Sequence, residues 1–319
     1  MSSPLRVSVI VTTRDRPAML AEAVASVFAQ ERPADELIVV DDGIDNHKDM
    51  KAQREKKTTV HNLPIRYLRG PGRGPGAARN VGLRAATGDL IAFLDDDDLW
   101  LPQKLAWQVE WFKRRPRLGV LGAEAKEDDG GRRHARPTPA RRTSNGGGHG
   151  NARPTAYKVV SRGALLRANR LGMSSVVARR ECLGEGFDES LPLAQDWDMW
   201  LRVARECEVG VVPAPLFIYR RHEGQRSADR AEMRRWEAVV IERALARGEA
   251  SDWWLRGVGR RRLAWAHGRL GRILVRCGET QRAWEELRES MSLFRFNPVV
   301  WAAWARCAFV MHIPARVKP

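Results

Sequence analysis

The chain has 319 residues, of which 43% are hydrophobic and 29% charged, a composition that excludes a disordered chain and predicts a globular protein with room for one large and one smaller domain. Its net charge of +16 is uneven: residues 1–128 carry 20 basic and 19 acidic side chains, whereas residues 129–319 carry 35 and 20. The two parts of the chain should therefore meet different partners, although charge alone does not choose among nucleic acid, anionic lipid, a phosphate-bearing substrate and a solvated arginine face.

The cysteines and the apolar runs predict where in the cell the protein is located. Cys182, Cys207, Cys277 and Cys307 form no C-x-x-C motif and no metal-like spacing, so we expect reduced, mostly buried thiols and a cytoplasmic protein. The N-terminal apolar run has the length of a strand rather than that of a signal peptide. No window reaches the roughly 18 apolar residues of a membrane helix.

The first elements in chain order are a strand, a helix and a strand. Residues 6–13 (RVSVIVTT) form a β-branched run typical of a buried strand. Residues 18–30 place apolar side chains at helical spacing after Pro17, a residue favoured in the first turn of a helix. Residues 35–43 form a second apolar run, which ends in two aspartates and a glycine.

A further strand, a glycine-rich loop with a helix, and another strand follow. Residues 63–70 predict the first strand and residues 90–98 the second, which ends in the aspartates 95–98. In an open α/β sheet, crossover connections make successive strands parallel, and ligands bind beyond their carboxyl ends. Asp41 and Asp42 should therefore meet the aspartates 95–98 in one crevice.

The rest of the chain divides into an irregular segment, a second ordered stretch and a helical end. Residues 128–154 are rich in glycine, proline and arginine without periodicity and predict a mobile loop. A helix at LAQDWDMWLRVARE and a strand at VGVVPAPLFIYRR come next. Beyond about Ala228, apolar residues repeat at three and four, which predicts an antiparallel helix pair joined at CGET.

Four consecutive aspartates repel one another unless a cation neutralises them. Mg²⁺ and Mn²⁺ prefer carboxylate oxygen and keep positions open for substrate phosphates, so this stretch is a candidate metal site. The alternative is an acidic loop or a helix N-cap, since Asp98 precedes the helical pattern of LWLPQKLAWQVEWF.

Two other segments bear on the chemistry. GPGRGPGAARN lacks the spacing of dinucleotide-binding and P-loop motifs, but it brings Arg79 toward the same crevice, where it would suit an anionic diphosphate. In LAQDWDMWLR, Asp196 and Asp198 flank Trp197 ahead of a helix. Asp196 is either an N-cap or a carboxylate whose raised pKa suits a general base.

In this order, the segments VSVIVTTRDRP, ELIVVDDG, GAARNVGLRAATGDLIAFLDDDDLWLP, GFDESLPLAQDWDMWLR and YRRHEGQRS closely resemble family 2 glycosyltransferases. The resemblance covers roughly residues 6–227. It implies the GT-A fold, a Rossmann-like α/β fold with a mostly parallel sheet flanked by helices. The division that follows is a nucleotide-sugar-binding and catalytic domain over 1–227 and a C-terminal α-helical domain over 228–319.

The same resemblance implies roles for the site residues. Thr12, Thr13 and Arg14 would line the pocket of the nucleotide base, and Asp42 would accept a hydrogen bond from the base. Arg79 would face the diphosphate. Asp95 and Asp97 would form the D-x-D pair, in which Asp97 is the direct ligand of Mn²⁺ or Mg²⁺, and Asp96 would lie near the ribose or sugar. His222 would be a further metal ligand, or else a surface histidine. Asp196 would be the catalytic base.

The implied reaction is inverting transfer of one sugar from a nucleoside diphosphate sugar, UDP-linked by expectation, to an acceptor hydroxyl of unknown identity. One departure weakens the donor prediction: the chain has DDGIDN where members often have DDGSTD. EMRRW (232–236) partly matches the Q-x-x-R-W of processive synthases, but a glutamate replaces the glutamine, so one sugar per encounter is expected.

The competing hypothesis is a non-enzymatic basic protein that binds nucleic acid or another partner through its C-terminal part. It leaves the acidic strand ends unexplained, so no nucleic acid is expected. Residues 230–319 carry 18 basic and 9 acidic side chains, and the C-terminal run VVWAAWARCAFVMHIP either packs as a buried helix or lies on an anionic membrane surface. Peripheral contact with the inner face of the membrane is therefore part of the expected location.

Overall fold

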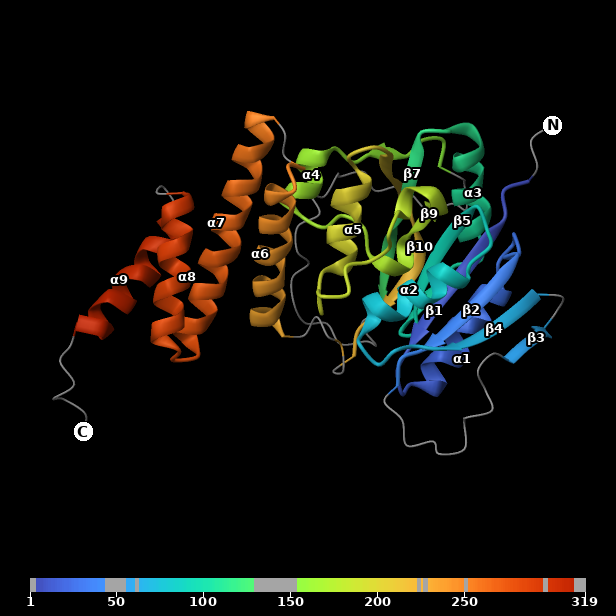
Figure 1. Ribbon diagram of the computed structural model, residues 1–319, viewed down its shortest axis with the longest axis horizontal. Coiled ribbons are helices and arrows are strands. Elements are labelled where there is room, and N and C mark those ends of the chain that lie inside the picture. The colour runs from blue at the N-terminus through green and yellow to red at the C-terminus, as the bar shows by residue number, and fades with distance from the viewer. Residues whose placement is uncertain are drawn as a thin grey trace.

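The structure is a computed structural model, and it describes residues 4–43, 56–60, 63–128, 154–222, 225, 229–249, 252–294 and 298–312. Within them the strands form one sheet of ten (Figure 1). The strands are β1 (Val7–Thr13), β2 (Glu36–Asp41), β3 (Lys56–Val60), β4 (Leu63–Arg69), β5 (Leu90–Asp95), β6 (Asp98–Trp100), β7 (Leu118–Asp128), β8 (Lys158–Val159), β9 (Val177–Arg179) and β10 (Glu208–Arg220).

The sheet has the order β3-β4-β2-β1-β5-β9-β7-β10-β6, with β8 beside β10. β1 pairs in parallel with β2 and β5, β2 with β4, and β7 with β10. The short strands β3, β6, β8 and β9 pair antiparallel. Most paired residues are therefore in parallel register, which confirms the predicted α/β fold class.

The central parallel strands β1, β2 and β5 are buried on both faces because alternate residues enter two different cores. Ile10, Ile38 and Phe93 face one core, while Val9, Leu37 and Leu94 face the other. Successive side chains of a strand point to opposite faces, so a run that is apolar throughout supplies apolar side chains to both cores. It explains why continuous hydrophobic runs, without alternation, marked these strands in the sequence.

Helices cover both faces of the sheet and continue beyond it (Figure 1). The helices α1 and α3 contribute to the core of Val9, and α2, α4 and α5 to the core of Ile10. Their bounds are α1 (Pro17–Phe28), α2 (Pro75–Ala85), α3 (Lys104–Arg114), α4 (Arg162–Arg167) and α5 (Gln195–Val203), with short 3-10 turns η2 (Met173–Ser175) and η3 (Arg180–Leu183).

Four helices follow side by side at the end of the molecule away from β1 to β4 (Figure 1): α6 (Arg230–Ala246), α7 (Trp253–Arg276), α8 (Thr280–Leu293) and α9 (Pro298–His312). The predicted antiparallel pair is α7 with α8, turning at Cys277 to Glu279. Ile241 and Leu263 of this region belong to the same core cluster as α4 and α5. Arg247 at the end of α6 also pairs with buried Asp198 of α5 at 2.6 Å. The division of the chain after residue 227 stays a prediction.

The alternative that made Asp98 a helix N-cap needs correction. Asp98 starts β6, which pairs with β10, and α3 begins at Lys104. The pairing requirement of the long strand β10 thus overrides the helical pattern. The predicted mobile loop 128–154 lies, apart from its end residues, outside the described residues.

The expectation of reduced, mostly buried thiols is also wrong in part. Cys182 of η3 and Cys207, just after α5, form a disulfide with their Cα atoms 6.8 Å apart. Cys277 is exposed and Cys307 buried. A spacing of 25 residues carries no motif, because tertiary packing alone brings η3 against the end of α5. The cytoplasmic location inferred from reduced cysteines therefore loses that support.

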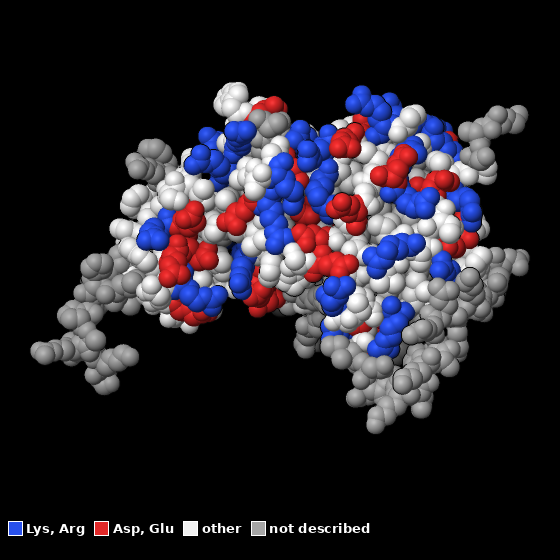
Figure 2. Space-filling view, viewed as in Figure 1, with Lys and Arg blue, Asp and Glu red and all other residues white. Residues whose placement is uncertain are grey.

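The surface charge is mixed. On the face seen in Figure 2, acidic side chains lie among the basic ones over the helical end as well as over the sheet. No helix in the described part of the chain has the length and apolar character needed to cross a bilayer.

A partly buried histidine joins three of the C-terminal helices. His267 of α7 lies with Nδ1 2.7 Å from Glu286 of α8 and Nε2 3.5 Å from Glu242 of α6. Burial by itself lowers the pKa of an imidazole, but the hydrogen bonds and charges of the two glutamates outweigh it and raise the pKa of His267 to about 9.

We expect this ion-pair cluster to make the stability of the protein depend on pH. The folded-state pKa of about 9 lies above the unfolded value of about 6.5, so the stabilisation is complete below about pH 6.5 and is lost as pH rises through 9. His267→Gln should therefore lower the free energy of unfolding by about 1–3 kcal/mol at pH 6 and by clearly less at pH 9.5. Urea unfolding of both proteins across this range measures it, and a difference that is equal at both pH values would contradict it.

Candidate active site

The carboxyl ends of β1, β2 and β5 open into a pocket of about 390 Å³, a size suited to a small-molecule ligand. Most of the residues singled out in the sequence line it, from segments nearly two hundred residues apart. They are Thr12, Thr13, Arg14, Asp42, Arg79, Asp95, Asp96, Asp97 and Asp196. His222 joins them through Asp97, with Nε2 3.0 Å from the carboxylate Oδ2. The roles that the resemblance gave these residues remain predictions.

Asp95 ends β5 and meets an arginine from the glycine-rich segment. Arg79 of α2 donates from Nη2 to Asp95 Oδ1 at 2.6 Å, and Thr12 at the end of β1 lies 3.4 Å from the same oxygen. Arg79 is buried, and its guanidinium also lies over the ring of Phe187. Helix α2 can pack this closely because Gly82 faces Ile10: a Cβ there would come within 2.6 Å of the isoleucine side chain. Arg79 is thus held with its charge toward the pocket.

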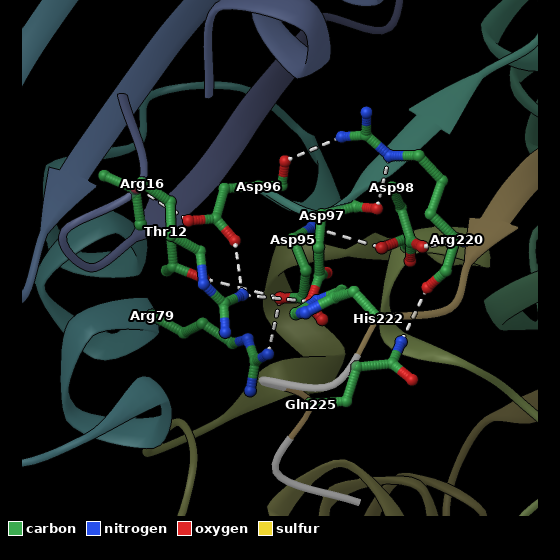
Figure 3. Close-up of polar contacts among 12 residues, drawn as sticks. Thr12, Arg16, Arg79, Asp95, Asp96, Asp97, Asp98, Arg220, His222 and Gln225 are labelled. Atoms are coloured by element: carbon green, nitrogen blue, oxygen red, sulfur yellow. Dashed lines mark hydrogen bonds and ion pairs between the residues drawn. The ribbon is translucent and has the colours of Figure 1, made fainter. Parts of the chain in front are cut away.

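Asp96 and Asp97 share a second arginine (Figure 3). Arg16 lies 3.3 Å from Asp96 Oδ1 and 3.1 Å from Asp97 Oδ2. Thr13 donates to the other oxygen of Asp96 at 2.7 Å. Burial nonetheless raises the pKa of Asp96, and the charges of Asp97 and Asp95 add to that effect, while Thr13 and Arg16 oppose it. The carboxylates are therefore crowded and only partly compensated by the protein's own cations.

Asp98 and Arg220 close the far side of this acidic turn. Arg220 of β10 donates its backbone N–H to Asp98 Oδ1 at 3.2 Å and its guanidinium to the carbonyls of Asp97 (2.7 Å) and Asp96 (3.2 Å). Burial raises the pKa of Asp98 to about 8, reinforced by the charges of Asp95 and Asp97 and opposed by Ser174 and the Arg220 N–H. Gln225 donates to the Arg220 carbonyl at 2.6 Å. The turn is therefore fixed by β10, the strand that ends two residues before His222.

Asp42 has a structural role that the sequence did not indicate. Its two carboxylate oxygens accept the backbone N–H groups of Gly72 and Gly74, each at 2.7 Å. Both glycines have positive φ, at 71° and 99°, which explains why glycine stands there. The carboxylate predicted to contact the base thus also shapes the loop that leads into α2.

Asp196 lies at the pocket wall in the first turn of α5, partly buried. It does not cap the helix, since the N-cap is Ala194, whose φ of 59° is rare for a residue with a side chain. Burial raises the pKa of Asp196, while Arg79, Asn169 and the Trp197 N–H oppose the rise. A partly buried carboxylate of raised pKa, facing a pocket, is suited to accept a proton.

The residues at Asp97 fit a divalent cation. The Asp97 carboxylate is the ligand type that Mn²⁺ and Mg²⁺ prefer, and the His222 imidazole lies 3.0 Å from it as a second nearby donor. Among the residues that the structure describes, no group of three acidic, histidine or cysteine side chains is arranged to hold a metal by itself. Mg²⁺ is often held by one or two protein ligands, with substrate phosphates and water completing the shell. The geometry therefore suits an ion that binds together with a diphosphate.

Fold and pocket together define a class: an α/β protein of the GT-A fold with an acidic pocket at the carboxyl ends of its parallel strands. The family model described as Glycosyl transferase family 2 matches residues 8–168, about half of the chain. The chain belongs to this family.

Three known proteins show how far the similarity extends. An uncharacterized glycosyltransferase of Nostoc sp. is 37% identical over 118 residues, which are 37% of this chain and only 36% of the relative. Residues 1–349 of S. aureus TarS in complex with UDP-GlcNAc match with a TM-score of 0.62 at 19% identity, over 95% of this chain and 88% of that chain. The mannosyltransferase PcManGT of Pyrobaculum calidifontis, in complex with GDP-Man and Mn²⁺, matches with a TM-score of 0.56 at 16% identity, over 98% and 82%. The two structures confirm the fold.

Three site residues were missed in the sequence. Arg220 stands beside other arginines, and nothing in the sequence marks it above its neighbours. Asn169, whose Nδ2 donates to Asp196 at 2.7 Å, belongs to no motif. The spacing of Arg16 after the strand-ending Thr12 and Thr13 is the one signal that would have placed an arginine at the mouth of the crevice.

We expect Asp42→Asn to weaken both the loop and ligand binding, because an asparagine has one acceptor oxygen and cannot receive both glycine N–H groups. The free energy of unfolding should fall by about 1–3 kcal/mol, and UDP should bind roughly ten times more weakly. Urea unfolding and calorimetry with UDP and Mn²⁺ measure these changes. The control is Asp89→Asn, which also accepts a backbone N–H, from Arg6 at 2.8 Å, but on the exposed surface. Unchanged UDP binding in Asp42→Asn would remove Asp42 from the ligand site.

Proposed function

We propose that the protein is an inverting glycosyltransferase that moves one sugar per encounter from a nucleoside diphosphate sugar, UDP-linked, to an acceptor hydroxyl. The observation that carries this proposal is the pocket where Arg79, the acidic turn 95–98 and Asp196 meet. The UDP-GlcNAc complex of TarS and the GDP-Man complex of PcManGT, proteins of the same fold, support a nucleotide sugar as the donor. The product belongs to glycan, glycolipid, glycoprotein or natural-product synthesis.

The donor would lie across the ends of β1, β2 and β5. Thr12, Thr13 and Arg14 line the side expected for the base, with Asp42 next to them. Arg79 is buried and directed into the pocket, so its guanidinium can hold the diphosphate and stabilise the leaving nucleoside diphosphate. Asp95 and Asp96 would orient the ribose and sugar. These are the donor-binding roles that the family resemblance implies, and they are part of the proposal.

Asp196 would act as the base. It would take the proton of the acceptor hydroxyl as that oxygen attacks the anomeric carbon, and the bond from this carbon to the diphosphate breaks in the same displacement. Attack from the face opposite the leaving group inverts the anomeric configuration. Asn169 and the Trp197 N–H each donate to one oxygen of the carboxylate, which holds it in place for the transfer.

Asp97 and His222, with Asp95 close by, would hold Mn²⁺ or Mg²⁺, which supplies charge stabilisation for the departing diphosphate. Arg16 now lies 3.1 Å from Asp97 and partly neutralises it.

The alternative of a non-enzymatic protein that binds nucleic acid is less well supported. The basic side chains of the helical end are partly paired, as Arg234 and Arg262 are with Glu237. Acidic side chains interrupt them over the face shown in Figure 2. A crevice lined by carboxylates repels a phosphate backbone.

We expect Asp196→Asn to lower the rate of sugar transfer by roughly a hundredfold or more, because the base is lost, while the affinity for the donor stays within about twofold. The measurement is UDP release from a panel of UDP-sugars with Mn²⁺, alongside calorimetric donor binding. Chelation of the metal should stop release by the unaltered protein. Unchanged turnover in Asp196→Asn would exclude this residue as the base, and a panel without any UDP release would exclude the donor class.

We also propose peripheral contact of the C-terminal helices with an anionic membrane surface. Helix α9 is apolar and leaves Trp301 47% exposed, and Arg306, five residues further along the same helix, is also exposed. Trp301 packs against Trp304, which stacks on Trp284 of α8, so the exposed indole is held by two other rings. Exposed aromatic rings and cations on one apolar helix are typical of helices at the boundary between headgroups and acyl chains.

This contact predicts flotation of the protein with vesicles of 30% phosphatidylglycerol at low salt and its loss in Trp301→Glu, since a carboxylate cannot enter the headgroup boundary without a cost in free energy. Trp253→Ala is the matched control because Trp253 is more exposed, at 86%, but lies on α7. Absence of flotation of the unaltered protein, or equal flotation of Trp301→Glu, would refute the contact.

A further inference from the structure

The carboxylate of Asp196 is oriented by a residue from outside its own helix. Asn169 donates from Nδ2 to Asp196 Oδ2 at 2.7 Å, and its own Oδ1 accepts the Leu171 N–H at 3.2 Å. The second bond fixes which end of the amide faces Asp196, because a flipped amide would lose both. Asn169 is exposed and lies in the irregular segment between α4 and η2. Its position therefore depends on what holds that segment.

Three side-chain donors hold α4 and the segment that follows it by backbone carbonyl groups, two of them in α4 and one in the segment. Trp197 Nε1 donates to Leu165 at 2.8 Å, and Trp200 Nε1 to Leu171 at 3.3 Å. The third donor is Arg262 of α7, whose Nε donates to the Arg167 carbonyl at 2.8 Å from 95 positions further along the chain. The tryptophans belong to α5, the helix of Asp196, whereas Arg262 brings in the C-terminal helices. The carbonyl that it holds lies two residues before Asn169.

Arg262 is itself fixed on several sides. Its guanidinium lies 5.1 Å from the ring of Trp197 and 4.8 Å from that of Trp265, and Nη2 donates to Glu237 of α6 at 2.7 Å. It is only 8% exposed, and its Nη1 is buried without a hydrogen-bond partner. A buried ion pair with an unsatisfied donor is a poor way to gain stability, and an apolar residue of similar volume would often serve better. The arrangement is therefore better explained by the backbone that Arg262 holds in position than by a gain in stability.

We propose that Arg262 is a positioning residue for the catalytic base, acting through the Arg167 carbonyl and Asn169 on the Asp196 carboxylate. The helices α6 and α7 then do more than extend the fold, since the base is set only when they are docked. This inference rests on the proposed function of Asp196. It concerns the orientation of that carboxylate and leaves donor binding at Arg79 and the acidic turn unaffected.

A double-mutant cycle tests the path, with the rate of UDP release from the fastest donor of the panel as the readout. Asn169→Ala should lower kcat by roughly ten- to a hundredfold and Arg262→Gln by roughly tenfold, each with the donor KM within about twofold. The double variant should be no slower than Asn169→Ala alone, because both changes break one path. If the loss of kcat in the double variant equals the product of the two single losses, the proposal is overturned.

The pH dependence separates positioning from a general loss of structure. Because Asn169 donates to the charged carboxylate, Asn169→Ala should shift the acidic limb of the kcat profile to higher pH, and Arg262→Gln should shift it in the same direction. A loss of folded protein lowers the rate at every pH without this shift. An unshifted limb in both variants would contradict the path.

The matched control is Arg269→Gln. Arg269 is on the same helix and lies over the same Trp265 ring at 3.8 Å, but it is exposed and makes no bond to the segment after α4 among the contacts described. Its kcat and pH profile should be unchanged. Where Arg262→Gln is unfolded at the assay temperature, Arg262→Lys takes its place in the cycle, since lysine keeps the charge opposite Glu237 without the planar fork.

The outcomes distinguish this inference from the proposed function. If Asp196→Asn is inactive while Asn169→Ala and Arg262→Gln both keep full activity, the positioning path is overturned and the proposed function is not. Asp196→Asn fully active would remove the base itself and the path with it.

Discussion

The structure depends on one electrostatic constraint: the consecutive carboxylates at the end of β5 have to lie close together beside a small number of arginines. The parallel sheet places the end of β1, followed by Arg16, at the same edge because the two strands run the same way. The protein relieves the repulsion with Arg79 on Asp95 and Arg16 on Asp96 and Asp97. The relief is incomplete, since burial together with the charges of Asp97 and Asp95 keeps the pKa of Asp96 raised. A cation bound with the ligand would complete it, so folding leaves an unfavourable interaction that binding can remove.

The elements around the pocket can be understood as supports for that edge. Gly82 lets α2 approach β1, which brings the buried Arg79 to Asp95. Asp42 shapes the loop before α2 through two glycine N–H groups. On the other side, the antiparallel pair of β6 with β10 places Arg220 on the backbone of the acidic turn. The polar groups among these supports are buried or half-buried, and leaving one of them without a hydrogen-bond partner would cost free energy. The native contacts are therefore strongly preferred over other arrangements.

Sequence reasoning identified what is local and periodic. The strands at 6–13, 35–43 and 90–98 were predicted because buried parallel strands are apolar throughout, and the convergence of the aspartates at the ends of the last two followed from topology alone. Sequence reasoning failed where the local structure depends on a residue or strand that is distant in the sequence. Asp98 begins a strand because β10 is available to pair with it, and Cys182 meets Cys207 because η3 packs against the end of α5. Asn169 has an ordinary sequence environment, and only the fold shows that its amide faces Asp196.

The C-terminal helices illustrate the same limit. Their periodicity predicted helices but gave no reason for Arg262, which in sequence is one of three consecutive arginines. In the fold it is buried between two tryptophans, and one of these is the neighbour of Asp196. A cation placed there is stabilised by the ring faces and by Glu237, but it remains less well solvated than in water. Because α6 and α7 also share a core cluster with α4 and α5, a displacement of these helices would be transmitted to the wall that holds Asp196. The helical end is thus better regarded as part of the structure that shapes the pocket than as an appendage to it.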